Sequence, residues 1–280
     1  TVPYAELHAH SQFSFLDGAS DPEELAHTAH ALGLHGLALT DHNGLYGAVR
    51  LAQAAKPLHL PTIFGAELSL DLKQKIPGQA DPQATHLLVL ARGVTGYRNL
   101  STQLSTALLA GEKNHPVYDL DALTAAAGDW YILTGCRKGH LGQALAAHPG
   151  AAPGRTDPAG RALAELVERF GERVVVELTR AGLPTDDEHI ARLTALAQAF
   201  DLPTVATNAV HYATRARFHD AQARAAIRAR RPLSELAGHL PPNASARLRD
   251  GARMRHLFGP APVAHTVTLA RECAFELSAA

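Results

Sequence analysis

The sequence is poor in several residue types, and each scarcity excludes a class of protein. Its 280 residues include only 2 cysteines, so disulfide bridges cannot hold a fold of this size together. This cysteine usage favours a reducing compartment, and we expect a cytoplasmic protein. No apolar run approaches the roughly 18 residues of a membrane-spanning helix, and no secretory leader is recognisable at Thr1. We therefore expect no membrane partner.

Neither sign of charge is in excess. The chain has 26 Lys and Arg residues against 27 Asp and Glu residues, which argues against a globally basic nucleic-acid clamp and against a disordered acidic chain. Hydrophobic residues make up 46% of the sequence, enough for a well-buried core. The residue type in unusual supply is histidine, with 17 copies.

Apolar segments alternate with amphipathic ones along most of the chain. The predicted strands are residues 4–10, 36–40, 62–70, 85–91, 130–134, 173–179 and 204–210. The predicted helices between them are 22–32, with Ser20 as the capping residue, 45–56, 97–110, 140–147, 161–170 and 186–200. Such alternation predicts an α/β fold with a parallel sheet covered by helices. Seven such units favour a closed barrel, with an open sheet as the alternative.

The composition changes after residue 212. Between residues 215 and 255 there are ten arginines and only three acidic residues. We predict a β/α barrel with a metal site over residues 1–212, and an Arg-rich helical appendage packed on it over 213–280. The arginines are either solvated helix faces or a track for the DNA phosphate backbone. Few aromatic residues accompany them (Phe218 and Phe258), so no base stacking is expected there.

Polar residues gather where the predicted strands end. His8 and His10 are two residues apart on one strand, so both imidazoles point to the same face. Six further candidates lie on or beside the predicted strands. Asp17, His42, Cys136 and His211 come at or after the end of a strand, Glu67 lies within residues 62–70, and His86 is near the start of residues 85–91. The carboxyl ends of strands meet at the ligand site of β/α proteins. Imidazole, carboxylate and thiolate groups there are ligands for zinc, manganese or iron. The other histidines, His239 and His256 among them, are predicted to be surface or packing residues.

The motifs that carry these residues resemble a known family. They are LHAHSQFSFLDGAS, ALTDHNGLYGAV, FGAEL, HLLVLA, LTGC and ATNAVHY. Together they resemble the polymerase-and-histidinol-phosphatase (PHP) domain, in the form that opens bacterial DNA polymerase III alpha subunits of the error-prone branch. The resemblance implies a distorted seven-stranded β/α barrel with up to three divalent metal ions at the carboxyl ends of its strands.

The resemblance also implies how the ligands are shared. His8, His10 and Glu67 would surround a first ion, and Glu67 would bridge to a second ion on His86 and Cys136. Asp17, His42 and His211 would hold a third. Glu67, His10 and His86 are the predicted catalytic residues.

The chain departs from the family pattern at one position. The family has Asp-x-His where this chain has Ala209-Val210-His211. The first ion therefore keeps three protein ligands, a number with which catalytic metals work. We expect this loss to weaken metal binding at the first site without abolishing it.

The predicted function is that of a metal-dependent phosphoric ester hydrolase. The favoured activity is a 3′–5′ exonuclease or phosphodiesterase on DNA, with a polymerase and other replication or repair proteins as partners. One alternative is a non-catalytic PHP domain that stabilises a polymerase or docks a partner, and Ala209 favours it. Retention of eight ligand-type residues argues against it. The other alternative is a small-molecule phosphatase of the histidinol-phosphate type, against which the Arg-rich segment speaks.

Overall fold

The computed structural model describes residues 1–72, 84–236 and 243–280, so His239 lies outside the described residues. Seven strands form one sheet in which each strand is the neighbour of the next along the chain. They are β1 (Ala5–Glu6), β2 (Gly36–Leu39), β3 (Thr62–Leu70), β4 (Thr85–Ala91), β5 (Trp130–Leu133), β6 (Val174–Thr179) and β7 (Thr204–Thr207).

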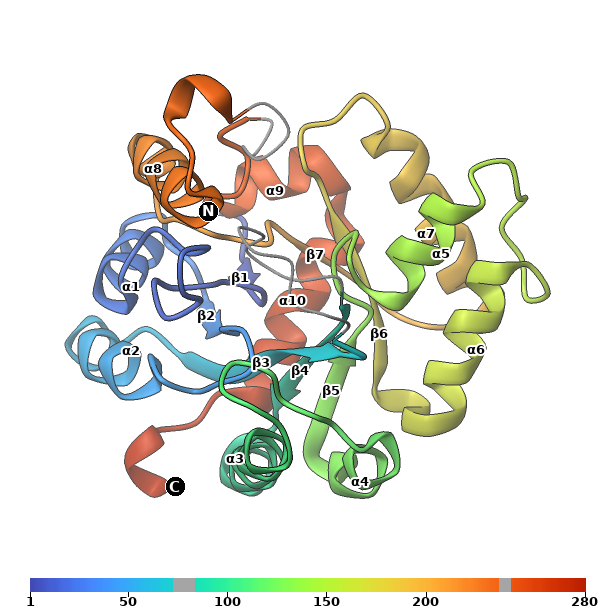
Figure 1. Ribbon diagram of the computed structural model, residues 1–280, viewed down its shortest axis with the longest axis horizontal. Coiled ribbons are helices and arrows are strands. Elements are labelled where there is room, and N and C mark those ends of the chain that lie inside the picture. The colour runs from blue at the N-terminus through green and yellow to red at the C-terminus, as the bar shows by residue number, and fades with distance from the viewer. Residues whose placement is uncertain (73–83, 237–242) are drawn as a thin grey trace.

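The two edges of this sheet meet just beyond β1 and β7. Ala9 and Val210 form a parallel bridge there. The amide of Val210 donates to the carbonyl of His8 at 2.9 Å, and the amide of His10 donates to the carbonyl of Val210 at 2.8 Å. The sheet is therefore a nearly closed barrel, which confirms the predicted fold class (Figure 1).

One strand gives the barrel its distortion. β4 runs antiparallel to both β3 and β5, whereas every other neighbouring pair is parallel. Its reversal pairs His86, near the start of β4, with Ser69 near the end of β3. His86 thereby reaches the carboxyl end of the barrel although it stands at the beginning of its own strand.

Helices surround the barrel (Figure 1). The first seven are α1 (Pro22–Ala31), α2 (Ala48–Ala55), α3 (Gly93–Ala110), α4 (Leu120–Ala126), α5 (His140–Ala147), α6 (Pro158–Phe170) and α7 (Asp186–Phe200). The predicted cap of α1 was one residue early. The side chain of Asp21 caps the helix by accepting from the amide of Glu24 at 2.7 Å. The hydroxyl of Ser20 instead accepts from the amide of Ala213 at 2.9 Å, and so ties this loop to the segment after β7.

Three more helices follow β7: α8 (Phe218–Ala229), α9 (Gly251–Phe258) and α10 (Pro260–Cys273). α10 packs against the amino ends of the strands, where the hydroxyl of Thr266 accepts from the amide of Ala5 at 3.1 Å. Its buried Leu269, Ala270 and Cys273 join the side chains that fill the barrel interior. α10 therefore closes the amino end of the barrel, and the boundary predicted at residue 212 stays a prediction. Within the described ranges, no helix is long and apolar enough to cross a membrane.

Candidate metal centre

The first group of ligand-type side chains lies just after β1. His8 and His10 are buried, and their Nε2 atoms are 3.0 Å apart. Glu67, on β3, places Oε1 at 3.5 Å from Nε2 of His8 and Oε2 at 3.3 Å from Nε2 of His10. These donor atoms all lie within 4.8 Å of one another, as a single metal ion requires. The three residues predicted for the first ion are thus together in the fold.

A second group shares the same carboxylate. Nδ1 of His86 lies 3.1 Å from Oε1 of Glu67, and Nδ1 of His42 lies 3.3 Å from Oε2. These three residues also lie within 4.8 Å of one another. Glu67 stands at the centre because its two carboxylate oxygens face the histidines of both groups. All nine residues of β3 are buried, and the side chain of Glu67 is only 2% exposed. Glu67 therefore belongs to both groups, and its role as a bridge between two ions stays a prediction.

The third predicted set lies at a more open corner. Oδ2 of Asp17 is 3.1 Å from Nε2 of His42 and 3.2 Å from Nε2 of His211. His42 therefore links Asp17 to Glu67. The side chains of Asp17 and His42 are 14% exposed and that of His211 is 30% exposed, against 1–2% for His8, His10, Glu67 and His86.

Cys136 lies beside this cluster in the loop that follows β5. Its carbonyl accepts from the amide of Gly139 at 3.0 Å, and Gly139 forms a bridge with His86. Cys136 is half-buried. Cys136 is in neither group of convergent donors found among the described residues, and His42 joins Glu67 and His86 instead. The assignment of Cys136 as a ligand stays a prediction.

Hydrogen bonds fix the orientation of the first two rings. The hydroxyl of Ser14 donates to Oδ1 of Asp41 at 2.7 Å, so its oxygen accepts from Nδ1 of His10 at 3.2 Å. Nδ1 of His8 donates to Oε1 of Glu177 at 2.8 Å. Both rings therefore turn Nε2 toward Glu67, the arrangement that metal-binding histidines adopt.

Sequence reasoning missed Glu177. It lies on β6, is fully buried, and also accepts a hydrogen bond from the hydroxyl of Thr207. The signal was present, because RVVVELT carries one acidic residue in an otherwise apolar strand, and such residues are almost never buried without a partner.

The buried charges of the site suit a bound cation. Burial opposes the charged form of His8, but the carboxylates of Glu177 and Glu67 outweigh it and raise the pKa of His8 to about 10. Burial lowers the pKa of His10 to about 3, and His42 acts in the same direction. A proton on His8 thus balances the buried carboxylates of Glu177 and Glu67 at the point where His8, His10 and Glu67 converge. A divalent cation would replace that proton, so the residues present fit a metal ion.

Ala209 stands where the family resemblance implies an acidic ligand. Its backbone is left-handed, with φ of 44°, and its carbonyl accepts from Nδ1 of His211 at 2.8 Å. The neighbouring Asn208 does not replace the carboxylate, because its amide donates to Oε2 of Glu6 at 2.7 Å, away from the cluster. His8, His10 and Glu67 thus offer one convergent donor atom each, and their assignment to a first ion stays a prediction.

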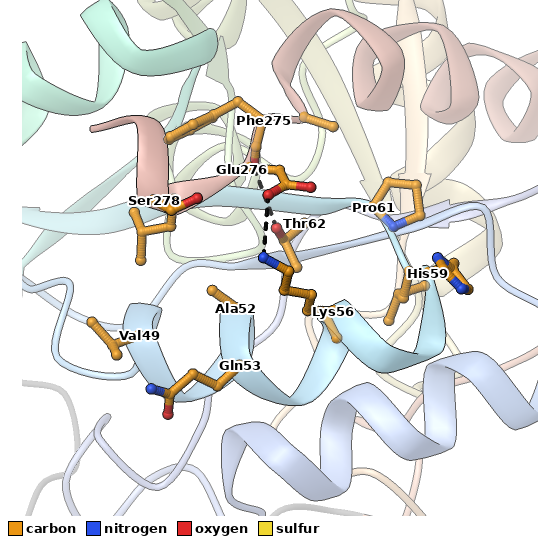
Figure 2. A pocket seen from close by; sticks show the side chains of 14 residues that line it. Val49, Ala52, Gln53, Lys56, His59, Pro61, Thr62, Phe275, Glu276 and Ser278 are labelled. Atoms are coloured by element: carbon orange, nitrogen blue, oxygen red, sulfur yellow. Dashed lines mark hydrogen bonds and ion pairs between the residues drawn. The ribbon is translucent and has the colours of Figure 1, made fainter.

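A hollow of about 670 Å³ lies elsewhere, between α2 and the C-terminal residues (Figure 2). Its lining includes Thr62, at the amino end of β3, and an ion pair of 3.7 Å between Lys56 Nζ and Glu276 Oε2. None of the eight predicted ligands lines it. We therefore place the candidate site at the carboxyl end of the barrel.

Comparison with known proteins places the sequence in a family. The model of the PHP domain family matches residues 6–181. An error-prone DNA polymerase of Mycolicibacterium paratuberculosis is 56% identical over 99% of this chain, and one of Nocardia farcinica is 51% identical over 99%. The chain spans only about a quarter of the length of these curated relatives, 25% and 28%.

Solved structures resemble the chain more distantly. A chain from Bifidobacterium adolescentis, itself only predicted to be a metal-dependent phosphoesterase, has a TM-score of 0.49 and 15% identity, covering 75% of this chain and 88% of its own. An amidohydrolase of Chromobacterium violaceum has a TM-score of 0.46 and 17% identity, with the same coverage of 75% and 88%. The family match extends over more than half of the chain and runs from the last residue of β1 through β6. The chain therefore belongs to the PHP domain family.

Proposed function

We propose that this domain is a metal-dependent phosphoesterase that hydrolyses DNA from its 3′ end. The observation that carries the proposal is the convergence of His8, His10, His42 and His86 on the single buried carboxylate of Glu67. A shared carboxylate among imidazoles is the donor set of a centre with more than one divalent ion. Zinc, manganese and iron all suit these ligands.

We assign all eight predicted side chains to this centre, with Cys136 and His211 at its edges. When bound, the ions would acidify water and neutralise the charge of a phosphate group. The chain's own residues supply the rest. Glu177 and Ser14 hold the rings of His8 and His10, and the packed strands exclude bulk water from Glu67. Asp17 and His42 stand where the site opens to solvent.

DNA is the proposed substrate because the relatives are named as DNA polymerases and because arginines are concentrated between residues 215 and 255. A polymerase, with replication or repair proteins, is the proposed setting, and a cytoplasmic location stays our expectation. The second candidate, a non-catalytic domain that supports a polymerase, is favoured by Ala209 alone.

The test is metal analysis of the purified chain followed by digestion of a 5′-labelled single-stranded oligonucleotide with Mn²⁺ or Zn²⁺. We expect bound metal and a ladder of products shortened from the 3′ end. Glu67→Gln should lower the rate at least 100-fold, because the variant loses the shared carboxylate charge. Glu165→Gln, on the exposed side of α6, is the matched control.

Two outcomes would overturn the proposal. Protein that binds no divalent ion and leaves the oligonucleotide intact would favour the non-catalytic domain. Hydrolysis of p-nitrophenyl phosphate without any digestion of DNA would favour the small-molecule phosphatase.

A further inference from the structure

The exposure of the ligand-type residues shows where the site opens. His8, His10, Glu67 and His86 are sealed, with side chains 1–2% exposed. Among the described ligand-type residues, exposure rises toward Asp17, at 14%, and His211, at 30%, and Cys136 at the other edge is half-buried. We take the corner at Asp17 and His211 as the entrance for substrate, so the residues that line it would contact the part of the substrate next to the reacting phosphate.

A tight turn forms one side of this mouth. The amide of Asp17 donates to the carbonyl of Ser14 at 2.9 Å, and Leu16 between them has a φ of 60°. The side chains of Ser14 and Asp17 both point inward, to His10 and to His42. Phe15, at the tip of the turn, is 78% exposed.

α8 forms the opposite side. Nη1 of Arg228 donates to the carbonyl of Leu16 at 2.6 Å and lies 3.7 Å from Oδ1 of Asp17. The guanidinium is thereby held within reach of the third ligand set and against the turn that carries Phe15. The adjacent Ile227 is 63% exposed.

Exposed apolar side chains are scarce elsewhere in the described part of the chain. Seven large ones are more than half exposed. One of them, Phe15, is two residues before Asp17, a second, Ile227, precedes Arg228 on α8, and a third, Tyr46, lies in the loop that follows His42. Aromatic residues make up only 5% of the sequence, so two exposed rings in the two loops that carry Asp17 and His42 are not explained by composition.

We propose that this rim, defined by Phe15 and Arg228, binds the terminal nucleotide of a single strand. The inference rests on the proposed function and names how the substrate is held. The ring of Phe15 stacks on the terminal base, and the guanidinium of Arg228 faces the adjoining phosphate. Stacking on a lone aromatic ring accepts every base, so the rim selects an unpaired end without selecting a sequence.

An unpaired strand fits this rim better than a protein partner does. A guanidinium anchored beside a carboxylate and an exposed ring match alternating phosphate and base. Both lie at the corner of Asp17 and His211, the most exposed of the ligand-type side chains whose exposure is given above. Few aromatic residues accompany the arginines of residues 215–255 in the sequence. The fold, however, brings the turn that carries Phe15 against α8.

The test compares two oligonucleotides that differ only in the terminal base. One ends in an ordinary 3′ nucleotide and the other in an abasic tetrahydrofuran residue. Phe15→Ala should lower kcat/KM about tenfold on the ordinary strand, mainly through KM, and less than twofold on the abasic strand. Phe15→Trp should restore the rate on the ordinary strand. Leu109→Ala, which removes a side chain 87% exposed at the end of α3, is the control and should change neither rate.

Equal losses on both strands, or no loss on either, would overturn the assignment of Phe15 while leaving the phosphoesterase intact. If the unaltered protein cleaves neither strand, the proposed function fails. In that case, fluorescence anisotropy measures how tightly the protein binds each strand without cleavage. A preference for the ordinary strand that Phe15→Ala abolishes supports the proposed role of the rim, and equal affinities for the two strands overturn it.

Discussion

Glu177 has no place in the motifs that identify the family, yet it controls the ring that begins the metal centre. Its carboxylate accepts from Nδ1 of His8, which leaves Nε2 as the donor toward Glu67. A carboxylate in this position both orients a histidine ligand and increases its basicity. At the scale of single residues, the site therefore depends on side chains that never touch the proposed ion.

Replacing this carboxylate tests that role. Glu177→Ala should weaken binding of Zn²⁺ to the metal-stripped protein 10- to 100-fold, roughly the range found for such partners. Glu177→Gln should bind with intermediate affinity, because its amide oxygen still accepts from His8 but carries no charge. The measurement is competition with a chromophoric chelator, with Glu165→Ala on the exposed face of α6 as the control. Identical affinities in the three proteins would show that Glu177 serves only packing.

At the scale of elements, α7 contains a histidine that should make stability depend on pH. Burial lowers the pKa of His189 to about 4, and the charge of Arg137 acts in the same direction. An unfolded chain has a histidine pKa near 6.5, so between pH 6.5 and about 4 it binds a proton that the folded chain does not. The free energy of unfolding therefore falls as pH falls through that window, by at most about 3 kcal/mol from this residue.

The comparison of His189→Gln with the unaltered chain isolates this contribution. Urea unfolding at pH 7 and pH 4.5, with chelator present throughout, should show a smaller acid-induced loss in the variant. His256→Gln, at an exposed position on α9, should lose as much stability as the unaltered chain. The same loss in all three proteins would contradict the assignment.

Elements also show where local patterns mislead. We expected the helix after β4 to start at residue 97, because Gly93 and Gly96 resemble breakers, but α3 begins at Gly93. A Cβ on Gly96 would lie 2.2 Å from the carbonyl oxygen of Asp129, so this glycine is needed for close backbone packing inside the helix. The sequence contains the glycine, but only the packed structure contains its neighbour.

For the whole molecule, a metal ion that binds only the folded chain should stabilise all of it. At 100 times its dissociation constant, such an ion adds about 2.7 kcal/mol, or roughly 5–10 °C in Tm for a chain of this size. We expect Tm to fall by about that amount on chelation and to return when Zn²⁺ or Mn²⁺ is added in excess. Glu67→Ala should show little of this shift, since it removes the carboxylate shared by both groups. A Tm that does not respond to either ion in the unaltered chain would mean that the cluster holds no metal.

The fold class follows from local patterns in the sequence, and so does the expectation that histidines and carboxylates gather at one end of the barrel. Strand-and-helix alternation is a local property. His8 and His10, just after β1, and Glu67, on β3, stand at positions whose side chains meet where the barrel closes. The motifs carried the family for the same reason, because each is a short continuous segment.

Which side chains converge at the candidate site, and which residues hold them in place, became visible in the folded chain alone. Glu177 is 169 residues from His8 along the chain, and Arg228 is 212 residues from the loop it anchors. The reversed β4 brings His86 to the site from the start of its strand, against the rule that strands present ligands at their ends. Such contacts arise from the closure and register of the barrel, which no local pattern of residues encodes.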